Sequence, residues 1–239
     1  MRFIPVLFNT PMVCAIEEGR KTQTRRIVKG FGPGVTAYRL ENHPVMQSSG
    51  VWEFACKREE NGVVHDFFVS VKSPYQVGDI LWVRETWMPV RWAKPQGNAI
   101  PADWKENGFM YYATDEIHNS DGSPVIWKPS IHMPREAARI FLRVKNVRCE
   151  RLQFITEDDA MAEGVNPEPP FSIAYPYIRG FISVWEKTIP KAKILQTGWD
   201  ANPWVWVIEF ERMEGPPAGF FADRDTAAYA DAGALMPAT

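Results

Sequence analysis

The residues best suited to chemistry lie in one short basic segment near the N-terminus. Residues 19–26 read GRKTQTRR, which brings four cationic side chains and two threonine hydroxyls together. A hydroxyl becomes a nucleophile when a neighbouring base takes its proton, and burial turns a lysine into such a base by lowering its pKa. The segment therefore offers a nucleophile in Thr24 and a base in Lys21, provided that the two side chains meet.

An extended backbone would separate these two groups. In a strand, Lys21, Gln23 and Arg25 share one face, while Thr24 and Arg26 share the other. A site that uses both Lys21 and Thr24 therefore requires a bend, or lies where the strand begins. The alternative is a solvated basic surface, which clusters of this composition usually form.

A second candidate site lies in residues 82–87, which read WVRETW. Trp82 and Trp87 flank Arg84 and Glu85, an arrangement suited to stacking on a base and hydrogen bonding to its edge. A buried strand in which Arg84 compensates the charge of Glu85 explains the same residues equally well.

A third candidate is His132, in the segment WKPSIHMPR at residues 127–135. Its imidazole titrates near neutral pH and can serve as an acid, a base or a phosphate donor. The two prolines indicate a rigid loop that would cover a pocket. The alternative is a histidine that is merely solvated or caps a turn, which is the commoner role of a lone loop histidine.

The composition argues against several classes of protein. The net charge is −2, with 27 Lys and Arg against 29 Asp and Glu, so no overall positive field attracts a long polyanion. The three cysteines are widely spaced and match neither a zinc motif nor a disulfide framework. No phosphate-binding glycine loop, Ser-His-Asp order or HExxH motif appears. We expect a protein that uses neither a metal nor a cofactor.

The sequence also lacks the marks of secretion and of membrane insertion. Its first ten residues, MRFIPVLFNT, contain no apolar core of a signal peptide. No window is long and apolar enough to span a bilayer. We expect a cytoplasmic protein with no membrane partner.

The hydrophobic pattern predicts more strands than helices. Apolar runs predict strands at 2–8, 80–83, 109–113, 138–152 and 204–210, and a hairpin with strands at 51–56 and 67–71. One helix is predicted to start with Thr10 as N-cap before Pro11, and another with Thr156 as N-cap and Asp159 completing a capping box. A third helix is predicted at 177–188. Together these elements predict an α+β fold built on a small barrel with flanking helices.

The basic segment resembles the signature of a known family. Gly19, Lys21, Thr24 and Arg26 fill the pattern Gly-x-Lys-x-x-(Glu/Thr)-x-Arg, which resembles that of ASCH domains, relatives of the PUA RNA-binding barrel. The Gly-Asp turn at 78–79 and the closing strand at 204–210 are similar to further elements of that family. The resemblance covers residues 3–26, 78–87, 139–165 and 204–210, and it implies a PUA-like β-barrel with flanking helices.

The resemblance also implies an activity and a set of site residues. The version with Gly-Arg-Lys-Thr-x-Thr-x-Arg resembles small bacterial N4-acetylcytidine amidohydrolases, and the whole chain resembles ASCH proteins often found in prophages. This implies a catalytic set in which Thr24 attacks the acyl carbonyl, Lys21 acts as base and Glu163 shuttles a proton or holds Lys21. Considered without the family, Glu163 would be an exposed residue at a helix end. The substrate-binding candidates are Arg20, Arg26, Trp82, Arg84, Glu85, Trp87 and His132.

We expect one domain at 1–213, with insertions at about 29–74 and 88–130 that the small amidohydrolases lack, and a flexible tail at 214–239.

Three functions stay open. The first is metal-free hydrolysis of an N-acylated pyrimidine nucleoside. The second is a non-catalytic module of phage or prophage origin that binds RNA or a modified base through Arg20, Lys21, Arg25, Arg26 and exposed tryptophans. The third is a barrel that serves only as an interaction scaffold.

Overall fold

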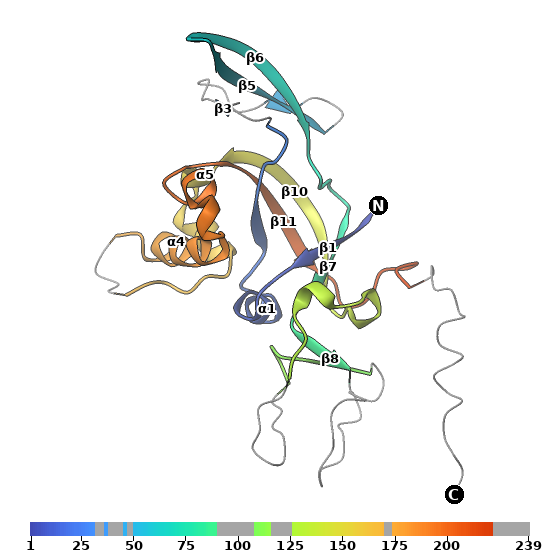
Figure 1. Ribbon diagram of the computed structural model, residues 1–239. Helices are drawn as coiled ribbons and strands as arrows, with labels where there is room; N and C mark the ends of the chain where they lie inside the picture. Colours follow the sequence, from blue (N-terminus) through green and yellow to red (C-terminus); the bar gives the residue numbers. More distant parts are fainter. Residues whose placement is uncertain are drawn as a thin grey trace, which may run out of the picture.

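The computed structural model describes residues 1–31, 36–37, 45–46, 50–89, 108–115, 126–169 and 174–221. At its centre is an open five-stranded sheet in the order β1-β7-β10-β11-β2. Strand β1 (Phe3–Leu7) runs parallel to β7 (Ile80–Arg84). The remaining pairs, through β10 (Phe141–Arg151), β11 (Trp204–Arg212) and β2 (Gln23–Ile27), are antiparallel. Strands β1 and β2 are therefore the edges of this sheet (Figure 1).

Strand β11 is buried on both faces, because its alternate residues enter two different cores. Trp206 and Ile208 belong to a core that also contains Val13 of the first helix and residues of β7 and β10. Val205 and Val207 belong to a second core on the opposite face. The continuous apolar run WVWVI is what a central strand covered on both sides requires.

Helix α1 (Thr10–Glu17) connects β1 to β2 and sets the direction of the basic segment. Asn9 is its N-cap, because the Asn9 side chain accepts a hydrogen bond from the Met12 N–H at 3.0 Å. The prediction of Thr10 as N-cap was wrong by one residue; Thr10 is the first helical residue. After the helix, Gly19 adopts φ = +74°, a left-handed conformation that favours glycine and turns the chain toward β2.

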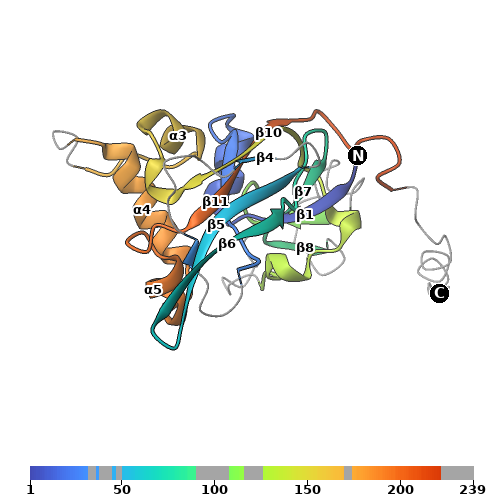
Figure 2. The same cartoon turned by 90° about the horizontal axis from the view of Figure 1, so that it is seen from above.

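Two helices after β10 cover the second core. Helix α3 (Glu157–Ala162) has the predicted capping box, in which Thr156 and Asp159 bond each other's backbone N–H groups. Helix α4 (Pro176–Thr188) packs Phe181 and Trp185 against that core. Both ribbon views show α4 and α5 (Ile194–Thr197) on the side of β11 and β2 (Figures 1 and 2). The short 3-10 helices are η2 (Ser130–His132), η3 (Arg135–Ala137), η4 (Leu152–Phe154) and η5 (Lys191–Lys193).

The first insertion forms a sheet of its own. Strands β5 (Val51–Glu60) and β6 (Val63–Lys72) make a long hairpin, and β3 (Thr36–Ala37) and β4 (Val45–Met46) pair with β5. The hairpin is joined to the central sheet by aromatic contacts. Trp52 lies 5.6 Å from Trp206 between ring centres, and Phe54 lies 5.6 Å from Trp204. In the second insertion, β8 (Trp87–Pro89) pairs with β9 (Phe109–Tyr111).

These elements confirm an α+β fold with mostly sheet and few helices. The central sheet is open, and the described strands do not close into a barrel. No described helix is both long enough and apolar enough to cross a bilayer.

The start of the predicted flexible tail is packed against the sheet. Phe220 is 1 % exposed and contacts Phe141 at 4.7 Å, Phe3 at 5.2 Å and Trp82 at 6.1 Å between ring centres. The boundary placed at residue 214 was therefore too early, because an aromatic ring packed among several others buries a large apolar area. Residues 222–239 lie outside the described residues.

Replacing Phe220 tests this packing. Phe220→Ala is expected to lower the free energy of unfolding by about 3–5 kcal/mol, the usual cost of removing a buried aromatic ring. Urea denaturation of the full chain measures it. The control is Leu195→Ala, because Leu195 is 91 % exposed and surface changes stay within about 0.5 kcal/mol. Equal stability of the two variants would contradict the packing of Phe220.

Candidate functional site

A buried ion pair joins the basic segment to the end of α3. The Lys21 Nζ donates three hydrogen bonds of 2.8 Å, to the Glu163 carboxylate, to the Glu163 carbonyl and to the Gln23 carbonyl. The Lys21 side chain is fully buried and that of Glu163 is 5 % exposed. The backbones of the two residues also form a β-bridge. Glu163 is therefore not the exposed residue that its helix-end position suggests by itself.

Gly164 makes this close approach possible. Its φ is +75°, and a Cβ built on it would lie 2.7 Å from the Cβ atoms of both Lys21 and Ala15. Real Cβ atoms do not approach that closely, so another residue at this position would push the end of α3 away from α1 and β2. The glycine lets the chain turn Glu163 inward against Lys21.

The environment of Lys21 disfavours its charged form. Burial lowers the pKa of Lys21, and the positive charges of Arg26 and Arg25 lower it further, while Glu163 opposes the shift. The pKa of Lys21 is therefore lower than that of a free lysine, so the neutral amine forms at a lower pH. This is the electrostatic condition that a lysine base requires.

Arg25 holds the carboxylates around this pair in place. Its side chain is fully buried and donates hydrogen bonds to Glu163 at 3.2 Å, to Glu150 at 2.6 Å and to Asp159 at 3.1 Å. Gln23 donates to the Asp159 side chain at 3.1 Å. The predicted common face of Lys21, Gln23 and Arg25 is thus the face that meets α3 and β10.

Asp159 is held in its charged form by the same network. Burial by itself raises the pKa of Asp159, but the charges of Arg25 and Arg148 and the hydrogen bonds from Gln23 and Arg148 outweigh it and lower the pKa. Arg148 donates to Asp159 at 2.7 Å. The network therefore ties α3 to β2 and β10 most firmly when Asp159 is ionised.

A cavity of about 810 Å³ opens along the free edge of β2. Among the residues that the family resemblance singles out, Thr24, Arg26 and Glu163 line this cavity. Further lining residues come from the β1–α1 junction, β11 and α4, and include Phe8, Trp206, Phe181 and Trp185. The cavity thus combines a polar side at β2 with aromatic rings from elements on both faces of the sheet.

The main chain of β2 also faces this cavity. The carbonyl of Thr22 accepts from the Phe210 N–H of β11, and the Val28 N–H donates to the carbonyl of Trp204. In an antiparallel strand, the main-chain N–H and C=O groups of every second residue point to the same neighbouring strand. Those of Thr22 and Val28 point to β11, so those of the odd-numbered Arg25 point to the free edge. The Arg25 side chain is 0 % exposed while the whole residue is 3 % exposed, so its accessible surface belongs to the main chain. The cavity wall therefore offers an N–H donor and a C=O acceptor side by side.

Phe8 connects Lys21 to the cavity. Lys21 is not among the residues that line the cavity, but its Nζ lies 5.4 Å from the centre of the Phe8 ring, which does line it. The Arg26 guanidinium lies 5.3 Å from the same ring. The Lys21 side chain runs along the edge of β2 and donates to the Gln23 carbonyl. Thr24, at 4 % exposure, lies on the cavity side of the same strand.

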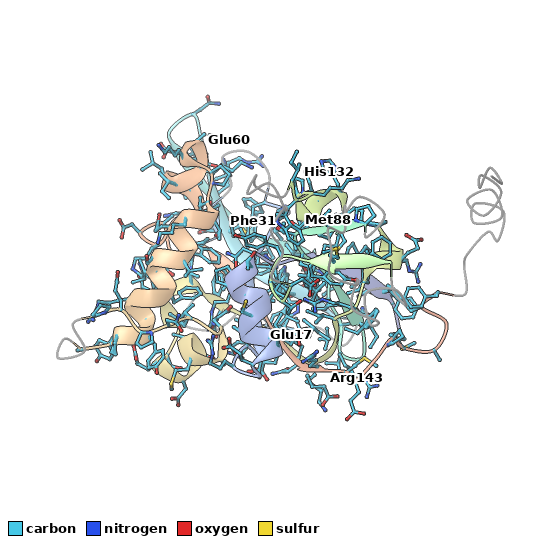
Figure 3. The ribbon with its side chains drawn as sticks, turned by 90° about the horizontal axis from the view of Figure 1, so that it is seen from below. Glu17, Phe31, Glu60, Met88, His132 and Arg143 are labelled. Atoms are coloured by element: carbon cyan, nitrogen blue, oxygen red, sulfur yellow. The ribbon has the colours of Figure 1, made fainter. Side chains whose placement is uncertain are left out.

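The other predicted contact residues lie elsewhere. Arg20 is exposed, pairs with Glu18 at 2.6 Å and donates to the Gly164 carbonyl at 2.9 Å. Trp82 packs against Phe220 in a separate core. Trp87 is buried beside Phe109 and Tyr111. His132 is exposed on η2, on the side of Met88 (Figure 3). None of Arg20, Trp82, Trp87 and His132 is among the lining residues of the cavity.

Arg84 and Glu85 do not compensate each other, contrary to the alternative that the sequence left open. Arg84 donates to the Ile131 carbonyl. Glu85, 1 % exposed, accepts two hydrogen bonds of 2.9 Å from Arg139. Burial raises the pKa of Glu85, and the contacts with Arg139 oppose that shift. This pair stabilises the junction of β7 and β10, and neither Arg84 nor Glu85 lines the cavity.

Comparisons with models of protein families, with curated proteins and with solved structures found no match. Within the described part of the chain, no three His, Cys, Asp or Glu side chains are grouped as metal ligands would be.

Gly164→Ala tests the close approach beside Lys21. We expect a loss of about 2–4 kcal/mol in the free energy of unfolding, because the left-handed conformation and the overpacking each cost about 1–3 kcal/mol. The matched control is Gly62→Ala in the β5–β6 turn, where φ is +77° but no atom lies within 4 Å of the added Cβ. Urea denaturation of both variants measures the difference. If Gly164→Ala costs no more than Gly62→Ala, the crowding against Lys21 is not real.

Asp159→Asn tests the carboxylate network through its pH dependence. At pH 7 the change is expected to cost about 1–3 kcal/mol, since it removes charged hydrogen bonds. The folded-state pKa of Asp159 lies below the ordinary 3.8. The stabilisation that ionised Asp159 provides is therefore fully present above pH 3.8, and it is lost as the pH falls through the lower folded-state pKa.

Unfolding curves at pH 7, 5 and 3 give the measurement, and the stabilities of wild type and variant should converge at the acid end. Asp158→Asn is the control, because Asp158 is the exposed neighbour in the same helical turn. A wild-type advantage that is the same at all three pH values would exclude the ionised network.

Proposed function

We propose that the chain is an ASCH-like hydrolase that cleaves an acyl amide on the exocyclic nitrogen of a pyrimidine nucleoside. One observation carries the proposal. Thr24 and Glu163 line the same cavity, and Glu163 is bonded to a fully buried lysine whose pKa is lowered. Lys21 and Glu163 are 142 residues apart in sequence, so their contact is a feature of the fold and not of the local motif. The PUA-like architecture is part of the same proposal and is supported by this contact and by the α+β sheet.

The shape and lining of the cavity suit a nucleoside-sized ligand. Its volume of about 810 Å³ lies within the usual range of about 300–1,000 Å³ for small-molecule sites. Phe8, Trp206 and Trp185 offer aromatic surfaces for a planar base. The main-chain N–H and C=O of Arg25 offer a donor and an acceptor for the polar edge of that base.

The proposed chemistry uses Thr24 as nucleophile and Lys21 as base. A neutral Lys21 takes the Thr24 hydroxyl proton as the oxygen attacks the acyl carbon. The ammonium of Lys21 donates all three N–H groups to protein oxygens, so Lys21 must lose a proton and release one of these contacts before its lone pair can accept from Thr24. Glu163 then holds the amine in position through the remaining hydrogen bonds.

The tetrahedral intermediate collapses by breaking the bond to the exocyclic nitrogen. The negative oxygen is stabilised by the Arg25 main-chain N–H at the cavity wall. The proton held by Lys21 passes to the leaving nitrogen, directly or through Glu163, and an acyl-Thr24 ester remains. Water attacks this ester with Lys21 again as base, which releases the carboxylic acid and restores the hydroxyl.

One observation favours a second function, the non-catalytic binding of a modified base. Each Lys21 donor is satisfied by a protein oxygen, as in a lysine that serves only structure. Arg25 is likewise enclosed by three carboxylates. The side chains of Lys21 and Arg25 are therefore not free to contact RNA directly, and such a module would bind through Arg26, the aromatic rings and the edge of β2.

Thr24→Val separates these two functions. The variant keeps the size of the side chain and removes the hydroxyl, so turnover of N4-acetylcytidine is expected to fall by about 10²-fold or more, while binding persists. Release of cytidine, followed by chromatography, is the measurement. The matched control is Thr22→Val, because Thr22 is the exposed threonine of the same motif and should keep wild-type turnover.

Three results would count against hydrolysis at Thr24. Full turnover in Thr24→Val excludes Thr24 as nucleophile. Tight binding of N4-acetylcytidine by the wild-type chain with no release of cytidine supports the binding module instead. Equal loss of turnover in the Thr22 and Thr24 variants points to a general effect on the fold of β2.

A further inference from the structure

Three cationic side chains line the same cavity beyond the catalytic candidates. They are Arg26 on β2, Lys29 just after β2, and Lys72 at the end of β6. Arg26 is partly buried, whereas Lys29 and Lys72 are exposed. Because β6 belongs to the first insertion, this part of the wall is built where the insertion meets the central sheet.

The end of β6 lies beside the residues that follow β2. A Cβ built on Gly30 would lie 3.5 Å from a methyl group of Val71, so the residues that follow β2 lie against the end of β6. The Val28 N–H is bonded to the Trp204 carbonyl, which anchors this part of the chain to β11. Lys29 and Lys72 adjoin Gly30 and Val71 in the sequence, and both line the same cavity.

The charge of this wall is not balanced by the residues around it. Glu163 is the only carboxylate among the described lining residues, and its two oxygens already bind Lys21 and Arg25. Arg26, Lys29 and Lys72 form no ion pair with any described residue. One Arg26 nitrogen donates to the Leu7 carbonyl, which leaves the other guanidinium N–H groups for a ligand. A chain of net charge −2 therefore has, at one cavity, three positive charges that the described residues do not neutralise.

A phosphate monoester fits this arrangement. It carries about −1.5 to −2 charges at pH 7 and three acceptor oxygens, and a guanidinium with nearby ammonium groups is the usual protein partner of such a group. Along β2, Arg26 lies two residues beyond Thr24, roughly 7 Å further at about 3.3 Å per residue. Lys29 lies further in the same direction. The cationic wall is thus displaced from the reacting end of the cavity.

We infer that the ligand of this cavity is a pyrimidine 5′-nucleotide, whose phosphate is bound by Arg26, Lys29 and Lys72 while its base lies toward Thr24. The inference rests on the proposed function for the identity of the base. A mononucleotide is favoured over a longer RNA, because the net charge of the chain is negative and strong RNA binding needs a long cationic path. The exposed Arg20 of the basic segment pairs with Glu18 and so does not extend such a path.

Binding of unacylated ligands tests the phosphate without requiring turnover. Calorimetric titration of the full chain compares cytidine with cytidine 5′-monophosphate at about 50 mM and about 300 mM salt. The nucleotide is expected to bind about tenfold tighter or more at low salt, with an advantage that shrinks as salt screens the contacts. The double variant Lys29→Gln/Lys72→Gln should remove most of this advantage and change the affinity for cytidine less.

The matched control is Lys191→Gln/Lys193→Gln, which removes two exposed lysines of η5 that do not line the cavity. It should keep the full preference for the nucleotide. Equal binding of cytidine and its monophosphate by the wild-type chain would overturn the phosphate inference and leave the proposed function standing. A preference that survives in Lys29→Gln/Lys72→Gln would overturn it as well.

Two further outcomes separate the remaining explanations. A cytidine-containing trinucleotide that binds more tightly than the monophosphate would replace the nucleotide with RNA as the ligand. No binding of cytidine, its monophosphate or the trinucleotide would overturn both this inference and the nucleoside-directed function on which it rests.

Discussion

The contact between the ammonium of Lys21 and the carboxylate of Glu163 places a constraint on much of the fold. Removing two charges from water costs several kcal/mol per ion, and a fold tolerates it only when the remaining donors and acceptors are satisfied. Here the three hydrogen bonds of Lys21 and the two terminal nitrogens of Arg25 meet most of that requirement, and the Arg25 Nε is the one donor of this network left without a partner among the described residues. The groups that supply them come from β2 and the end of α3, and Arg25 extends the network to β10. Gly164 then has to be small enough to let α3 approach.

The position of β2 at the sheet edge gives the site its second property. An unpaired strand edge presents main-chain donors and acceptors that a neighbouring strand would otherwise occupy. In this chain α4 and the β1–α1 junction flank the edge of β2 and turn it into one wall of a cavity. The same strand thus carries the ion pair on one set of residues and exposes Thr24 and Arg26 to the cavity on the other.

The tryptophan-flanked segment shows where interpretation of a sequence reaches its limit. Residues 82–87 were equally compatible with a stacking wall and with a buried strand, and the structure has a buried strand beginning in β7. The partner of Glu85 is Arg139, 54 residues away, so the adjacent Arg84 gave a misleading local explanation. Phe220 is a similar case, because a ring in a Gly- and Pro-rich segment carries no periodic signal that announces its burial.

The sequence by itself determined the local features of this protein: the α+β class, the hairpin, the capping box of α3 and the shared face of Lys21, Gln23 and Arg25. Each depends on side-chain alternation or on hydrogen bonds between residues a few positions apart. Only the tertiary structure decided that Glu163 is buried against Lys21, that Lys72 from an insertion lies in the same cavity as Arg26, and that Trp82 and His132 lie outside it. Burial and pairing of charges depend on which distant segments meet, and no pattern within one segment contains that information.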